Sequence, residues 1–202
     1  QGQETKISHY RGINLAPDWS PDGGKIVLTL SEDNGNSDLY LISPQGEKLK
    51  RLTKEWANDV SPCWSPDGRE IAFVSNRAGN PQIYIMEVST EKVRRLTFAG
   101  GYNTSPAWSP RGDRIAYASM AGSAFSICTI NTDGSNPRQL TDAGSCESPS
   151  WSPDGRHIAF SSSRAGKKKI YIMLADGSGV RPVTGGEGND TNPSWSPYID
   201  YR

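Results

Sequence analysis

The residues that could act in catalysis are few, and their spacing fits none of the common catalytic motifs. The only histidines are His9 and His157, and the chain has no G-x-S-x-G nucleophile elbow, H-E-x-x-H pair or P-loop. His157 follows a WSPDG phrase at a place that other copies of the phrase fill with Lys25, Glu70 or Arg114, which indicates an exposed polar position. The sequence therefore predicts no catalytic residue and a protein that is not an enzyme.

Metal and cofactor chemistry is not indicated either. Cys63, Cys128 and Cys146 form no C-x-x-C pair and are odd in number, so they predict neither a zinc site nor a full disulfide framework. The acidic stretch 31–38 lacks the D-x-D-x-D-G spacing and distal Glu of a calcium loop, so a solvated hairpin is favoured. The lysine run 167–169 occupies the matching loop of another repeat and is also expected to be solvated. We predict no metal and no cofactor.

The charge balance excludes two large classes of partner. Lys and Arg number 22, and Asp and Glu also number 22, so no net field draws the chain to nucleic acid or to an anionic membrane. No apolar run approaches the roughly 18 residues that a membrane-spanning helix needs. Binding through exposed loops is the interpretation that remains, and the elements that carry those loops follow from a repeat.

One five-residue phrase occurs five times. WSPDG stands at 19–23, 64–68 and 151–155, WSPRG at 108–112 and WSPYI at 195–199, so the tryptophans are 45, 44, 43 and 44 residues apart. A fixed period of about 40–45 residues is typical of a propeller blade. Ser-Pro-Asp-Gly is a hairpin-turn signal, and the Trp before it is expected to fill the core rather than to stack on a sugar or a base.

Four strands, A to D, are predicted in each repeat. Strand A carries P-x-W-S, runs such as IAFVS from Ile71 and IYIM from Ile83 supply B and C, and a phrase such as RRLT at 94–97 ends D. The B and C runs are apolar at nearly every position, which indicates sheets covered on both faces. We therefore predict an all-β chain, a β-propeller of four-stranded antiparallel blades. The four full blades are expected at about 14–53, 58–97, 102–141 and 145–184.

The two ends of the chain predict an incomplete ring. Residues 4–8 match a lone strand D, and residues 190–197 match a lone strand A whose phrase has lost its glycine. We expect residues 1–202 to be one propeller domain or a fragment of one. Open blade edges invite pairing, so the chain is expected either to belong to a larger ring or to self-associate.

The candidate binding surface lies at one end of the blades. In this strand order the B–C and D–A loops share an end, and the D–A loops are long and variable, as binding loops on a rigid scaffold usually are. Polar residues four or five positions before each Trp are expected at the mouth of the ring, where they contact a partner or bond their own loop backbone. Two equivalent B–C arginines either serve one structural role or anchor an interface. The candidate set is Asp59, Asn103, Thr104, Glu147, Asp190, Thr191, Arg77 and Arg164.

The repeat resembles that of the TolB propeller family over essentially the whole chain. The resemblance is carried by P-x-W-S-P-D-G-x-x-I-A-F at 62–73, S-N-R-A-G-N-P-Q-I-Y-I-M at 75–86 and R-R-L-T at 94–97. The ending PSWSPYID is similar to the last strand of that family, which closes the ring. By this comparison an N-terminal domain and the first part of a six-bladed propeller lie outside the sequence.

What the resemblance implies is a periplasmic protein–protein interaction scaffold without catalysis of its own. Its partners would be the peptidoglycan-associated lipoprotein Pal and other Tol proteins, and its role would be outer-membrane integrity and cell division. Two alternatives stay open on the residues alone. The chain could be an accessory propeller of a serine peptidase, or a propeller that binds a small molecule or sugar at the mouth of its tunnel.

Overall fold

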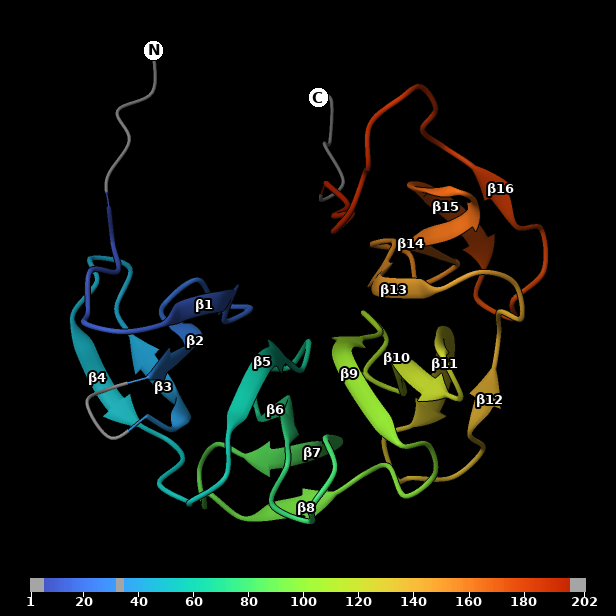
Figure 1. Cartoon of the computed structure of the whole chain (residues 1–202). Helices are drawn as coiled ribbons and strands as arrows, with labels where there is room; N and C mark the ends of the chain where they lie inside the picture. Colours follow the sequence, from blue (N-terminus) through green and yellow to red (C-terminus); the bar gives the residue numbers. More distant parts are fainter. Residues whose placement is uncertain (1–5, 32–34, 197–202) are drawn as a thin grey trace. The chain divides into compact units, whose positions relative to one another are not determined.

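The computed structural model describes residues 6–31 and 35–196, and within them the chain is all-β (Figure 1). Sixteen strands form four antiparallel four-stranded sheets in the orders β1-β2-β3-β4, β5-β6-β7-β8, β12-β11-β10-β9 and β13-β14-β15-β16, here called blades 1 to 4. This confirms the predicted all-β propeller of four-stranded blades. The strands are β1 (Asn14–Trp19), β2 (Ile26–Ser31), β3 (Ser37–Ile42), β4 (Lys48–Arg51), β5 (Asp59–Trp64), β6 (Glu70–Ser75), β7 (Gln82–Glu87), β8 (Val93–Arg95), β9 (Tyr102–Trp108), β10 (Arg114–Ala121), β11 (Ala124–Asn131), β12 (Arg138–Gln139), β13 (Cys146–Trp151), β14 (His157–Ala165), β15 (Lys167–Leu174) and β16 (Arg181–Pro182).

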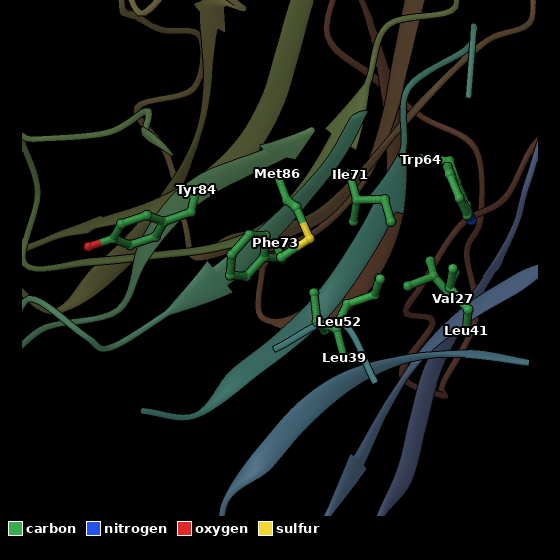
Figure 2. Packing of buried hydrophobic residues seen from close by; sticks show 9 residues of the cluster. All are labelled: Val27, Leu39, Leu41, Leu52, Trp64, Ile71, Phe73, Tyr84 and Met86. Atoms are coloured by element: carbon green, nitrogen blue, oxygen red, sulfur yellow. The ribbon is translucent and has the colours of Figure 1, made fainter. Parts of the chain in front are cut away.

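The chain divides into two compact units, which are described separately. Unit 1 (Gln1–Arg95) contains blades 1 and 2, and unit 2 (Leu96–Arg202) contains blades 3 and 4. In unit 1 the apolar faces of the two blades meet in one cluster, with Val27 and Leu39 from blade 1 against Ile71 and Phe73 from blade 2 (Figure 2). Unit 2 has an equivalent cluster around Trp151 and Phe160. This packing accounts for the apolar residues on the faces of the B and C strands that meet within each unit.

The Ser-Pro-Asp-Gly phrase closes the turn between strands A and B. In blade 2 the Ser65 hydroxyl donates to Asp67 at 2.7 Å and accepts the Glu70 N–H at 2.9 Å. Asp67 accepts the Arg69 N–H at 3.1 Å, and Gly68 takes a φ of 70°, a left-handed value that favours glycine. The Ser65 hydroxyl is the main reason that the pKa of Asp67 lies below its ordinary value. The Ser-Pro-Asp-Gly phrase therefore forms and stabilises the turn between strands A and B.

Every strand A is interrupted by a bulge that the sequence did not predict. In blade 2, Asp59 and Val60 pair with Ser75 and Val74, and the register then shifts before Cys63. The bulged residue lies three positions before the Trp and directly before a Pro, which has no N–H for the ladder. Its φ is left-handed, between 49° and 53°, at Ala16, Ser61, Ser105 and Ser148, and Asn192, at the matching place outside the four blades, has a φ of 54°.

The two flanking segments carry no strand in the described residues, 6–8 and 190–196. A strand needs a hydrogen-bonded neighbour, and no other segment described here supplies strand C for the first or strand B for the second. Ile7 and Tyr10 pack instead on an apolar cluster of blade 1 that includes Leu28. Trp195 still donates its Nε1–H to the Ser150 carbonyl at 3.0 Å, as Trp151 does to Ala107 at 3.1 Å, so it keeps the place of a strand A tryptophan.

The expectation that each repeated Trp fills the core is wrong for the first copy. Trp64, Trp108 and Trp151 are 6%, 8% and 7% exposed, but Trp19 is 52% exposed. In unit 1 the Trp of blade 2 packs on the face of blade 1, whereas no blade among the described residues of unit 1 packs on Trp19. Leu15, on the same strand, is also exposed. Self-association through this edge stays a prediction.

Truncating the two kinds of tryptophan should have unequal effects. Trp151→Ala is expected to lower the free energy of unfolding by about 3–5 kcal/mol, because it leaves a cavity between two sheets. Trp19→Ala should lower it by less than about 1.5 kcal/mol, because half of the ring is already in water. Urea unfolding followed by circular dichroism measures both. Equal losses would contradict this account of Trp19.

Candidate functional site

The candidate residues lie at the end of the blades that carries the B–C hairpins and the D–A loops, here called the loop end. In unit 1 a buried ion pair holds it together. Arg77 donates through Nη2 to both carboxylate oxygens of Asp59, at 3.1 and 2.9 Å, and through Nε to the Ser75 hydroxyl at 2.9 Å. Asp59 has no exposed surface. The Arg77 guanidinium also lies 5.5 and 5.1 Å from the ring centres of Phe73 and Tyr84, within cation–π range.

Unit 2 has an equivalent arginine, Arg164, whose partner on strand A is a cysteine instead of an aspartate. Arg164 lies 5.5 and 4.8 Å from the rings of Phe160 and Tyr171, and its Nε donates to the Ser162 hydroxyl at 3.1 Å. In place of the carboxylate stands Cys146, fully buried, with its Sγ 3.7 Å from Arg164 Nη2. Both arginines therefore fix a B–C hairpin over the aromatic core of its blade, which supports the structural interpretation of this repeated residue.

The lysine run makes ion pairs that the sequence did not predict, while Lys167 and Lys168 stay accessible to solvent as expected and Lys169 does not. Lys168 donates to both oxygens of Glu147, at 3.0 and 2.9 Å, and Lys167 lies 3.2 Å from a Glu187 oxygen. Lys169, with a side chain only 9% exposed, contacts Asp190 at 3.0 Å. Its amine also donates to two carbonyls of the 185–190 loop, at 3.1 and 2.7 Å. Two ion pairs, Lys167–Glu187 and Lys169–Asp190, thus join this D–A loop to β15 of blade 4, and the third joins Lys168 to Glu147 in β13.

The loop of Asp190 is held by the Thr184 hydroxyl and by hydrogen bonds with Lys168 and Lys169 of β15. The Thr184 hydroxyl is the main cause that lowers the pKa of Asp190, followed by the Lys169 amine. The Lys168 N–H donates to Asn189 at 2.9 Å, and the Asp190 N–H donates to the Lys168 carbonyl at 2.8 Å. These bonds tie the loop of Asp190 to β15 of blade 4.

The predicted set divides into buried and accessible members. Asn103 has no exposed surface and donates to the Ala99 carbonyl of its own loop at 2.7 Å, as the backbone-bonding alternative expects. Asp59 is equally buried. The surface that the set offers to a partner comes from Arg77 in unit 1 and from Thr104, Glu147, Arg164, Asp190 and Thr191 in unit 2.

One polar residue that matters in the structure was missed from the sequence. Asp18 lies in β1 and its Oδ2 accepts the main-chain N–H of Trp64 in the next blade at 2.7 Å. Burial raises the pKa of this carboxyl, and the N–H of Trp64 only partly offsets that effect. The repeat did contain a signal for Asp18. The residue directly before the Trp is uncharged in the other blades, where it is Cys63, Ala107 or Ser150.

Four-stranded antiparallel blades, each with one tryptophan beside its A–B turn, define the class of this protein as a repeat-built β-propeller. A family model described as the TolB beta propeller domain matches residues 1–199. The chain belongs to the TolB propeller family. No helix of the described residues is long and apolar enough to cross a membrane, and these residues hold no group of three or more side chains suited to a metal ion.

Comparisons with individual proteins agree with this family. The chain is 46% identical over 76 residues to a Protein TolB homolog of Chlorobium luteolum, which covers 37% of this chain and 17% of that protein. It is similar to the crystal structure of TolB from Acinetobacter baumannii, with a TM-score of 0.84, 29% identity, and coverage of 95% of this chain and 48% of that one. The chain therefore spans about half of that solved protein. A puromycin-hydrolyzing peptidase of Mycobacterium tuberculosis, at a TM-score of 0.70 and 14% identity over 88% of this chain and 29% of that one, shares the fold alone.

Removing the buried carboxylate of unit 1 should destabilise the protein strongly. Asp59→Ala leaves the Arg77 guanidinium without its anion, and we expect the free energy of unfolding to fall by about 3 kcal/mol or more. Asp59→Cys should cost less, because unit 2 accommodates a thiol beside Arg164. Urea unfolding of both variants checks this, and equal losses would show that the guanidinium tolerates no substitute.

Asp18→Asn is expected to stabilise the protein at neutral pH. The amide oxygen can still accept the Trp64 N–H, while the charge that burial disfavours is gone. Because the pKa of Asp18 is raised in the folded state, its ionisation reduces stability as the pH rises through that value. The gain from Asp18→Asn should thus vanish below the ordinary pKa of 3.8. Thermal melts across pH measure it.

Asp22→Asn is the matched control for this pH experiment. The Ser20 hydroxyl holds the pKa of Asp22 below its ordinary value, so its ionised form supports the fold. The variant should lose stability above about pH 4 and match the wild type below the folded pKa. A gain at neutral pH in both variants would contradict the assignment.

Proposed function

We propose that this chain is the interaction module of a non-enzymatic periplasmic protein of the Tol–Pal system. The observation that carries the proposal is the match to the TolB beta propeller domain across residues 1–199. The proposed partner is the peptidoglycan-associated lipoprotein Pal, with other Tol proteins engaging the whole protein. The proposed roles are outer-membrane integrity and cell division.

The loop end of unit 2 is the proposed docking surface. Its charges are already paired within the chain, as Lys168 with Glu147 and Lys169 with Asp190. A partner therefore meets loops whose conformation is set, and binding loses little further conformational entropy. Arg77 and Arg164 act as supports for the hairpins, and the contacts come from Thr104 and Thr191 beside the ion pairs.

The test is binding of Pal to the full-length protein, measured by isothermal titration calorimetry. Thr191→Lys places a long charged side chain on the exposed loop end and is expected to weaken binding roughly tenfold or more. Thr90→Lys is the matched control, because Thr90 is also exposed but lies in the C–D turn of blade 2, at the other end of its sheet.

Two outcomes would overturn the proposal. One is the absence of a complex between the wild-type protein and Pal. The other is an equal effect of Thr191→Lys and Thr90→Lys, since that result would place the contact away from the loop end.

A further inference from the structure

The loop end of blade 4 contains an arginine that lacks the carboxylate partner of its counterpart in blade 2. Arg164 and Arg77 occupy equivalent positions, and each lies over two aromatic rings of its own blade. Arg77 forms an ion pair with Asp59 at 2.9 Å. At the place of Asp59, Arg164 meets the Sγ of Cys146, at 3.7 Å. Because a thiol is a weak acceptor, no anion matches the charge of Arg164 there.

The other carboxylates of this loop end do not neutralise Arg164 either. Three of them are each paired with one lysine of the run 167–169, at 2.9, 3.2 and 3.0 Å, and they are Glu147, Glu187 and Asp190. Asp142, in the D–A loop before blade 4, makes no ion pair with Arg164 in the part of the chain that the structure describes. Each lysine of the run therefore has an anion, and the arginine beside them has none.

One terminal nitrogen of Arg164 is available to an acceptor from outside. The Nε–H donates to the Ser162 hydroxyl at 3.1 Å, and Nη2 is the nitrogen that contacts Cys146. The other nitrogen, Nη1, donates to no group of residues 6–31 and 35–196, and it is accessible to solvent. A side chain that is only partly exposed thus directs an unused charged donor outward.

The surroundings of the guanidinium favour binding of an anion. Its centre lies 5.5 and 4.8 Å from the ring centres of Phe160 and Tyr171, which are buried and keep water from that side. An electrostatic contact beside such an apolar group is stronger than one surrounded by water. The bond to Ser162 and the two rings also hold Arg164 in place, so that it loses less conformational entropy on binding.

We propose that Arg164 binds a carboxylate of the protein partner, an aspartate or glutamate side chain in the role that Asp59 has in blade 2. The carboxylate accepts a charge-assisted hydrogen bond from Nη1. Arginine is also among the residues that contribute most to the affinity of protein interfaces. This inference rests on the proposed function, because it adds one contact within the loop end of unit 2. Arg164 still supports its hairpin, through Nε and the two rings.

The variant that tests the inference supplies the missing carboxylate from within the chain. Cys146→Asp gives blade 4 the ion pair of blade 2, and Cys146→Ser replaces the thiol by a neutral group as the matched control. Cys146→Asp is expected to weaken binding of Pal to the full-length protein roughly tenfold or more in isothermal titration calorimetry, because its carboxylate occupies Arg164. Urea unfolding should show no loss of stability. Cys146→Ser should leave the affinity unchanged.

A second measurement does not need Pal. The Nε–H resonances of Arg77 and Arg164 are followed by ¹H–¹⁵N NMR while sodium acetate is added, with sodium chloride at equal ionic strength as the reference. Acetate should shift the Arg164 resonance of the wild-type protein further than that of Arg77, whose anion is Asp59. In Cys146→Asp the two resonances should respond alike.

Two results would contradict this inference and leave the proposed function standing. One is a loss of Pal affinity in Cys146→Asp that is no larger than the loss in Cys146→Ser. The other is an Arg164 resonance that acetate moves no further than that of Arg77, a result that the wild-type protein gives even if Cys146→Asp does not fold. Absence of any complex with Pal would overturn the proposed function instead, and the acetate titration would then decide this inference alone.

Discussion

The constraint on which the structure depends is that each sheet is apolar on both faces, so a blade cannot bury its surface alone. Ile71 and Phe73 are fully buried because blade 1 covers one face of blade 2, and Val27 and Leu39 are buried by the same contact. Apolar burial is the main favourable term in folding. Stacking of neighbouring blades is therefore a condition of stability, and each strand A tryptophan depends on the blade before it. Trp19, which no blade among the described residues of unit 1 covers, is exposed.

Stacking also decides which parts of a blade are free to vary. Within each unit the B and C strands of one blade pack against the other blade, so their residue types repeat closely from blade to blade. The ends of the blades contact only loops and turns, and there the repeats differ. Asp59 becomes Cys146 opposite an equivalent arginine, and a polar hairpin in blade 2 becomes a triple-lysine hairpin in blade 4. The blades therefore differ in chemistry at their ends, while their B and C strands are nearly the same from one blade to the next.

The fold could be predicted from the sequence because stacked blades require the same residue types at a regular spacing. The spacing of the tryptophans and the position of each Pro-Asp-Gly turn predicted four sheets in the correct strand order. The bulge before each Pro was not predicted, because it is a backbone conformation and a Ser or Ala at those positions does not indicate a left-handed φ. The pairing of Lys167–Lys169 escaped because each carboxylate partner comes from a distant part of the chain, which a single sequence does not bring together.

Departures from the repeat were more informative than the repeat itself. Asp18 stands where other blades have a small residue, and its carboxylate takes a main-chain N–H of the next blade. In the same unit the Trp64 indole loses the carbonyl partner that its counterparts at 151 and 195 keep. The boundary within unit 1 is thus held by a carboxylate that accepts a main-chain N–H, whereas the boundary within unit 2 is held by an indole that donates to a main-chain carbonyl.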